Sequence, residues 1–160
     1  MSSQQILLGS GGAADKVYID DLFSLYTHIG NADVQNIQNG VDLTKGGFVW
    51  AKDRASTAEH RFFNTNQGAG VRMIPSTNGA PDTETNSLTA FNANGFTLGN
   101  DSVINGGGDE VITWTMRKQE KFFDIVSYTG NATNRTISHN LGSVPGMIIV
   151  KRTDSSGHWL

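Results

Sequence analysis

The chain has 160 residues, a length that fits one ordinary domain better than two of typical size. It contains 19 glycines and no cysteine, which excludes disulfide frameworks, thiolate zinc sites and cysteine nucleophiles. With 12 basic against 15 acidic side chains, it lacks the basic composition of a nucleic-acid-binding protein. Because the sequence shows neither a signal peptide nor an apolar run of about 20 residues, we expect no membrane insertion.

The predicted elements are strands. Short apolar or alternating segments are separated by Gly, Asn, Asp and Ser turn signals at intervals of roughly 8–12 residues, a spacing that favours a sandwich or barrel over βαβ units. The sequence therefore predicts an all-β sandwich. Its expected strands span residues 5–8, 23–28, 34–37, 48–52, 61–64, 70–74, 88–91, 95–98, 110–116, 123–128, 133–138 and 147–152.

Residues 14–26 also fit a helix. Apolar residues there and just beyond recur at helical spacing, at Tyr18, Leu22, Leu25 and Ile29. Alternation over residues 23–27 favours a strand instead, and the internal repeat described below supports a strand from Phe23 onward.

The clearest alternation is EVITWTMRK, residues 110–118. It places Ile112, Trp114 and Met116 on one face and Val111, Thr113, Thr115 and Arg117 on the other. One of these faces is expected to line the core.

An internal repeat relates the middle of the chain to its last forty residues. Gly30-Asn31 and Ile37 recur 100 residues later, Gly47 and Lys52 recur 99 residues later, and His60 recurs 98 residues later. Self-similarity at a long period indicates tandem units. We therefore predict an N-terminal segment (Met1 to Asp21), one complete unit (22–121) and the first strands of an incomplete second unit (122–160). The second unit would be completed by chain beyond Leu160 or by a neighbour.

Four stretches carry a resemblance to known proteins: GGFVWAKDR, NSLTAFNANGFTLGND, EVITWTMRKQEKFFDIVSYTGN and ISHNLGSVPGMIIVKRTD. In these the chain resembles tail-fibre-like virion proteins of marine bacteriophages, especially those that infect cyanobacteria. The resemblance covers essentially the whole chain after Asp20, together with the QQILLGSGGA start. It implies a jelly-roll, concanavalin-like sandwich repeated in tandem, with no enzyme activity and no cofactor.

The resemblance also implies a location and partners. We expect a virion protein assembled in the host cytoplasm, commonly as a homotrimer, that contacts other tail, baseplate or capsid proteins and supports host recognition. The N-terminal segment is the expected docking element. Its candidate contact residues are Gln5, Ile6, Leu7, Leu8, Val17 and Tyr18.

A glycan-binding module is the alternative function, and a capsid decoration protein is a further alternative. Aromatic side chains can stack on host surface sugars if they are exposed, whereas in strands of this pattern they usually belong to the core. The candidate glycan contacts are Trp50, His60, His158 and Trp159.

Other chemistry finds little support in the sequence. Asp101, Asn105 and Asp109 offer oxygen ligands for a cation, although a plain Asn/Gly turn explains them as well. Residues 6–14 formally match a dinucleotide-binding glycine motif, but no helix and parallel strand are predicted to follow. No catalytic site, metal site or cofactor is therefore predicted.

Overall fold

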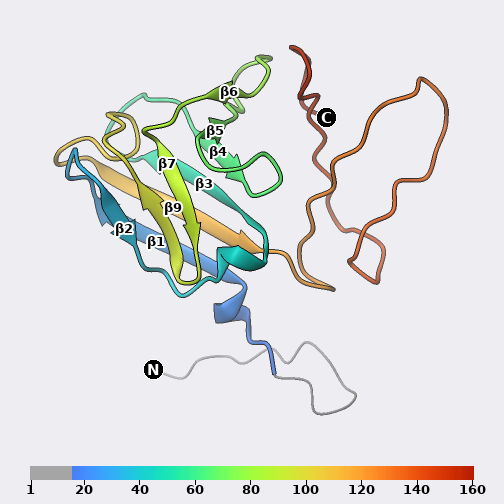
Figure 1. Ribbon diagram of the computed structural model, residues 1–160, viewed down its shortest axis with the longest axis horizontal. Helices are drawn as coiled ribbons and strands as arrows, with labels where there is room; N and C mark the ends of the chain where they lie inside the picture. The colour runs from blue at the N-terminus through green and yellow to red at the C-terminus, as the bar shows by residue number, and fades with distance from the viewer. Residues whose placement is uncertain (1–15) are drawn as a thin grey trace.

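The computed structural model describes residues 16–160, and their regular secondary structure consists almost entirely of β-strands (Figure 1). Two short 3-10 helices, η1 and η2, span Ile19–Asp21 and Leu43–Lys45. The strands are β1 Phe23–Ile29, β2 Gln35–Ile37, β3 Gly47–Asp53, β4 Arg61–Asn64, β5 Val71–Arg72, β6 Asp82–Thr83, β7 Leu88–Asn92, β8 Gly95–Leu98 and β9 Glu110–Arg117.

The strands form antiparallel sheets in a sandwich-like arrangement, which confirms the predicted fold class. One sheet has the order β1-β9-β3-β4 and the facing sheet has the order β2-β8-β7. A small β5-β6 ribbon adjoins β4 through a bridge between Phe62 and Met73. Strand β9 therefore joins the start of the unit to its middle, because it pairs with β1 on one side and β3 on the other.

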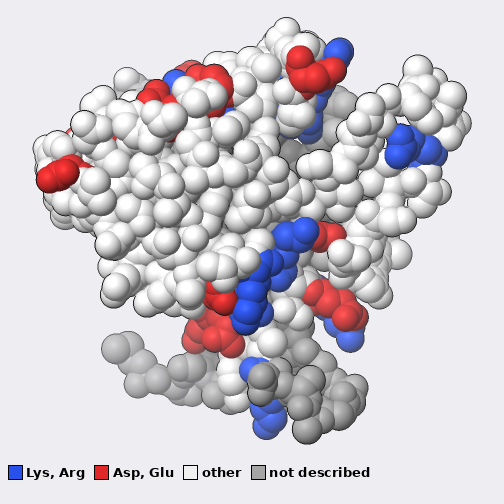
Figure 2. Space-filling model, in the orientation of Figure 1, with Lys and Arg blue, Asp and Glu red and all other residues white. Residues whose placement is uncertain are grey.

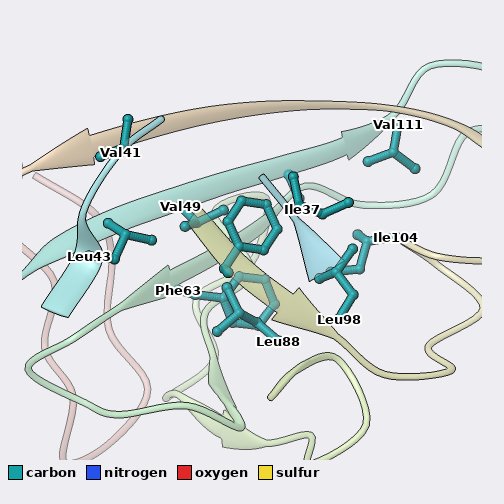
Figure 3. Close-up of a cluster of buried hydrophobic side chains, with 11 residues drawn as sticks. Ile37, Val41, Leu43, Val49, Phe63, Leu88, Leu98, Ile104 and Val111 are labelled. Atoms are coloured by element: carbon teal, nitrogen blue, oxygen red, sulfur yellow. The ribbon is translucent and has the colours of Figure 1, made fainter. Parts of the chain in front are cut away.

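A single apolar cluster lies between the two larger sheets (Figure 3). Strand β3 contributes Val49 and Ala51, which are buried, while its alternate residues point outward and are half-buried. The cluster contains Ile37, Val41, Leu43, Val49, Ala51, Phe63, Leu88, Phe96, Leu98, Ile104 and Val111. Burial of these side chains is the main favourable contribution to folding, at about 25 cal/mol per Å² of apolar surface.

The inward face of β9 is largely polar. Val111 is buried in the core, but Thr113, Thr115 and Arg117 are the next residues on that face and are also buried. The threonine hydroxyls have partners, since Asn39 Nδ2 donates to Thr115 Oγ1 at 2.8 Å and Thr113 Oγ1 donates to the Tyr26 carbonyl at 3.2 Å. The predicted separation of faces is confirmed, and the core side is the Val/Thr side.

The chain enters the sandwich through η1, and β1 begins at Phe23. The helical alternative for residues 14–26 is therefore wrong for its described part. Pairing of β1 with β9 along seven residues outweighs the helical spacing of the apolar side chains.

The sandwich unit (residues 22–121) joins the C-terminal segment (residues 122–160) at a polar junction. Lys118 Nζ lies 3.0 Å from Asp124 Oδ1, and the Asn140 amide donates to Asp124 Oδ2 at 2.8 Å. Burial alone would raise the pKa of Asp124, but the hydrogen bond from Asn140 and the Lys118 ammonium together hold it below its usual value. The junction therefore anchors the start of the segment to the end of β9.

The C-terminal segment runs beside the sandwich as an extended chain (Figure 1). Residues 123–128, 133–138 and 147–152, predicted as strands, form none here, although isolated bridges join Gln119 to Phe123 and Lys151 to Trp159. In the sandwich unit β9 lies between β1 and β3, whereas within the described chain no strand lies between residues 123–129 and 146–152.

Charged side chains are sparse on the visible face of the sandwich (Figure 2). Within residues 16–160, no helix has the length and apolar character needed to cross a bilayer.

Candidate functional site

Four aromatic side chains gather on the outer face of the four-stranded sheet. This aromatic face consists of Phe48, Trp50, Phe62 and Trp114. The ring centroids of Trp50 lie 4.9 Å from those of Trp114 and 5.0 Å from those of Phe62, and Phe48 lies 5.0 Å from Phe62. Trp50, Trp114 and Phe48 are half-buried, so their surfaces are partly open to solvent.

Strand register explains the cluster. Trp50 on β3 lies directly opposite Trp114 on β9 and Phe62 on β4, and directly opposed residues in antiparallel strands share one face of the sheet. Phe63, the next residue of β4, points inward and is fully buried in the core. The aromatic residues thus divide between the two faces, which their residue type alone does not predict.

His60, the residue before β4, extends the aromatic face. The Trp50 indole Nε1 donates a hydrogen bond to His60 Nδ1 at 2.7 Å, so that nitrogen carries no proton. Burial, together with the nearby Lys52 ammonium, lowers the pKa of His60. The imidazole is therefore held neutral as the acceptor for Trp50.

The same outer face continues as an apolar surface toward β1. Leu25 lies opposite Trp114 and is 56% exposed, and Phe23 lies opposite Met116 and is also exposed. Ile112 and Met116 lie on the same face of β9 and are half-buried. Contiguous exposed apolar surface on a folded domain commonly marks a binding face.

Trp159 approaches the aromatic face from the C-terminal segment. Its ring packs edge-on against Phe62 with centroids 5.6 Å apart, its Nε1 donates to the Thr77 carbonyl at 3.1 Å, and Lys151 Nζ lies over the ring. Three of the four predicted glycan contacts, Trp50, His60 and Trp159, thus gather around Phe62. His158 is exposed on the segment, and its predicted contact with glycan stays a prediction.

A family model covers nearly all of this architecture. Residues 20–160 match the model described as a domain of unknown function, DUF7483. The chain belongs to the DUF7483 family. Comparison with curated proteins and with solved structures found no match.

The DUF7483 match includes both the sandwich unit and the C-terminal segment. It begins at Asp20, so nearly all of the predicted docking segment precedes it. Gln5, Ile6, Leu7 and Leu8 lie outside the described residues. Val17 and Tyr18 are half-buried just before η1, where the Tyr18 amide donates to Asp21 Oδ2 at 2.9 Å, and their docking role stays a prediction.

The loop of the DUF7483 domain between β8 and β9 contains the three candidate cation ligands. Asn105 is fully buried and its Nδ2 donates to the carbonyls of Gly99 and Asp33, both at 2.7 Å. Asp101 is also buried, and its Oδ1 accepts from the Val103 amide at 2.6 Å. Among the described residues, no group of three or more acidic, histidine or cysteine side chains could hold a metal ion. Asp101 and Asn105 thus make hydrogen bonds within the loop and, through Asn105, to the turn before β2.

The acidic pair beside β5 also has structural partners. Arg72 lies 2.9 Å from Asp82 and 3.3 Å from Glu84, and its hydrogen bond and charge lower the pKa of Asp82. Two hollows lie on the described surface. One lies at the Lys118–Asp124 junction, and another lies beside His28, Arg54 and Glu110.

His28, lining the second hollow, is a buried histidine that the sequence did not single out. Its Nε2 lies 3.2 Å from the Ile104 carbonyl, and burial lowers its pKa. No sequence signal distinguishes it from the other histidines.

Proposed function

We propose that this DUF7483 protein is a structural protein of a bacteriophage virion, the N-terminal part of a tail fibre that attaches to the particle and supports host recognition. The main support for the proposal is a set of exposed apolar side chains that can form contacts with other subunits. Val144, Met147 and Ile148 in the C-terminal segment are 93%, 79% and 68% exposed, and the outer sheet face adds Leu25. Such surface suits subunit contact and strand addition.

The four stretches that resemble marine phage fibre proteins supply the biological setting of this proposal. The residues 1–21 that would dock to the particle precede the sandwich unit, and the exposed apolar segment follows it. This order suits a module that joins neighbours at both ends. We further propose that the protein acts without enzyme activity and assembles as a homotrimer.

Particle labelling tests the proposal. An antibody against residues 22–121 should label the tail or its baseplate on purified particles of a phage that encodes this sequence. A phage variant lacking residues 1–21 should lose the label, whereas a matched variant with residues 9–14 replaced by another Gly/Ser sequence should keep it. Unlabelled particles would contradict a virion role, and label confined to the capsid would favour a decoration protein.

Mass measurement tests the oligomer. A homotrimer has three times the 17.2 kDa mass of the chain, and light scattering after size-exclusion chromatography resolves these states. A purely monomeric protein at every concentration would contradict the trimer.

Host-glycan binding is the second candidate, and the aromatic face favours it. Stacked, partly exposed tryptophans on an open sheet match the chemistry of sugar recognition, in which ring faces contact the apolar side of a pyranose. A glycan array probed with the full chain should then show binding that Trp114→Ala removes. Tyr128→Ala, an exposed aromatic on the C-terminal segment, is the control that should retain it. No binding to any glycan, or equal loss in both variants, would reject the glycan function.

A further inference from the structure

The two copies of the repeated turn share one conformation. Ala32 and Ala132 both have positive φ angles, 57° and 59°. The Asp33 amide donates to Asn31 Oδ1 at 2.9 Å, and the Thr133 amide donates to Asn131 Oδ1 at 3.2 Å. Local sequence therefore builds the same turn in both places.

The two copies of the Gly-apolar-Lys stretch also share a pairing. Ala51 lies opposite Arg61 between β3 and β4. Ninety-nine residues later, Val150 and Leu160 exchange both backbone hydrogen bonds, at 2.8 and 3.1 Å. The C-terminal segment therefore contains the beginning of a similar hairpin, in which Trp159 lies opposite Lys151, one residue beyond the matched His158.

The environments of the two turns differ. In the sandwich unit, the Ala32 amide donates to the Asn105 carbonyl at 2.8 Å and the Gly30 amide donates to the Asp109 carbonyl at 2.9 Å. The Asn31 amide also donates to the Asn105 side chain at 3.2 Å. The 99–109 loop thus closes the first turn, whereas residues 130–132 are exposed.

The repeated glycines give the sharpest contrast. A Cβ atom on Gly30 would overlap the Gly106 carbonyl oxygen, and one on Gly47 would overlap the Met116 carbonyl oxygen. Both positions therefore need glycine because the 99–109 loop and β9 approach so closely. Gly130 and Gly146 occupy the equivalent positions, yet a Cβ on either would meet nothing within 4 Å.

We propose that the C-terminal segment is a binding site for a polypeptide stretch that repeats residues 62–121. In that stretch, a glycine-rich loop carrying an asparagine closes the turn at residues 130–132. The strand that follows it, with the pattern of β9, inserts between residues 123–129 and 146–152. Gly130 and Gly146 lack a side chain and therefore permit the close approach of this loop and strand. The bound stretch then covers Met147, Ile148 and Ile149, which are exposed in its absence.

A folded second copy of this chain does not fit as the occupant. Its β9 is already paired on both sides, and its Asn105 is fully buried. The occupant is therefore a further stretch of the repeat that is not engaged in a unit of its own. This inference holds wherever the protein lies in a particle and does not rest on the virion proposal.

Extension of the full chain tests the inference. Because Leu160 takes the place of Arg61 in the hairpin register, residues 62–121 are repeated directly after Leu160, and amide hydrogen exchange is compared with that of the unextended chain. We expect exchange in residues 123–129 and 146–152 to slow by roughly 100-fold or more in the extended chain.

Two variants locate the contact. Gly130→Ala should leave the unextended chain unchanged and abolish the new protection in the extended chain. Replacement of the asparagine equivalent to Asn105 by alanine in the added stretch should remove protection at residues 130–133. Extension without protection, or protection that survives Gly130→Ala, would overturn the inference. Dimerisation of the unextended chain with protection of residues 123–129 would also overturn it, since the occupant would then be a second copy.

Discussion

The sandwich unit and the C-terminal segment begin with the same local signals and reach different structures. Both contain a Gly-Asn-Ala turn with an alanine at positive φ, and both contain a glycine followed by an apolar run and a lysine. In the unit the turn connects β1 to β2 and the repeated glycine begins β3, while in the segment both are followed by largely exposed chain and the isolated bridge between Lys151 and Trp159. The comparison teaches that local sequence sets a turn, whereas a strand persists only where another strand pairs with it.

The largest expected difference lies at the repeated glycine of the turn. Gly30→Ala should destabilise the protein by more than about 4 kcal/mol, since the new methyl overlaps backbone that cannot move away cheaply. Gly130→Ala should change the free energy of unfolding by less than about 0.5 kcal/mol. Denaturant unfolding of both variants measures the two free-energy changes. Equal changes would contradict the difference between the two turns.

Asn105 should show the next largest effect. Asn105→Ala removes the donors to the buried Gly99 carbonyl and the Asp33 carbonyl, at an expected cost of about 3 kcal/mol in the free energy of unfolding. Asn131→Ala is the matched control, because its side chain serves an exposed turn, and about 0.5 kcal/mol is expected. Urea titration monitored by tryptophan fluorescence measures the free energy of unfolding of both variants. An Asn105→Ala protein as stable as the original would contradict the role given to this residue.

Side chains two residues after the repeated glycines sharpen the contrast further. Val49 is fully buried, so Val49→Ala should cost about 2 kcal/mol through lost burial and a residual cavity. Ile148 holds the equivalent place but is 68% exposed, and Ile148→Ala should stay within about 0.5 kcal/mol. Thermal unfolding of the two variants measures both changes in stability. A larger loss of stability for Ile148→Ala would show that the C-terminal segment is packed.

The smallest effect is a pH dependence that arises from two histidines of the sandwich unit. His28 and His60 have lowered pKa values in the folded state, in both cases through burial, so the unfolded chain takes up protons at a higher pH. Stability should therefore be full above about pH 6.5 and fall as the pH drops below it. The double variant His28→Gln with His60→Gln should flatten this slope in unfolding curves recorded between pH 7.5 and 5. An unchanged slope in the double variant would show that the pH dependence of stability arises from other groups.

Much of the fold could be predicted from the sequence. The expected strands 61–64 and 95–98 coincide with β4 and β8, because their apolar runs end sharply at turn residues. Strand β6 is not among the expected strands, since the two residues Asp82 and Thr83 show no apolar run or alternation, and their pairing with β5 is accompanied by the Arg72–Asp82 contact. The strands expected after Phe122 depend on long-range pairing, which local pattern does not encode.

The candidate site was less predictable. Alternation in β9 separated Trp114 from Thr113 correctly but could not say which side faces the core, because the buried side carries threonines and an arginine. The sequence suggests Asn105 as a cation ligand through its side-chain oxygen. In the fold its side-chain nitrogen instead donates to Asn31 and Asp33, in a turn more than seventy residues away. Such contacts are set by tertiary structure alone.

Native-state hydrogen exchange on the unmodified chain tests the central claim most directly, namely that residues 22–121 form a complete unit and residues 122–160 do not. We predict that amides in β1, β3 and β9 exchange only through global unfolding, while amides in the exposed residues 126–129 and 146–149 exchange nearly as fast as in an unstructured peptide. Equal protection of the two regions in a monomer would contradict the account.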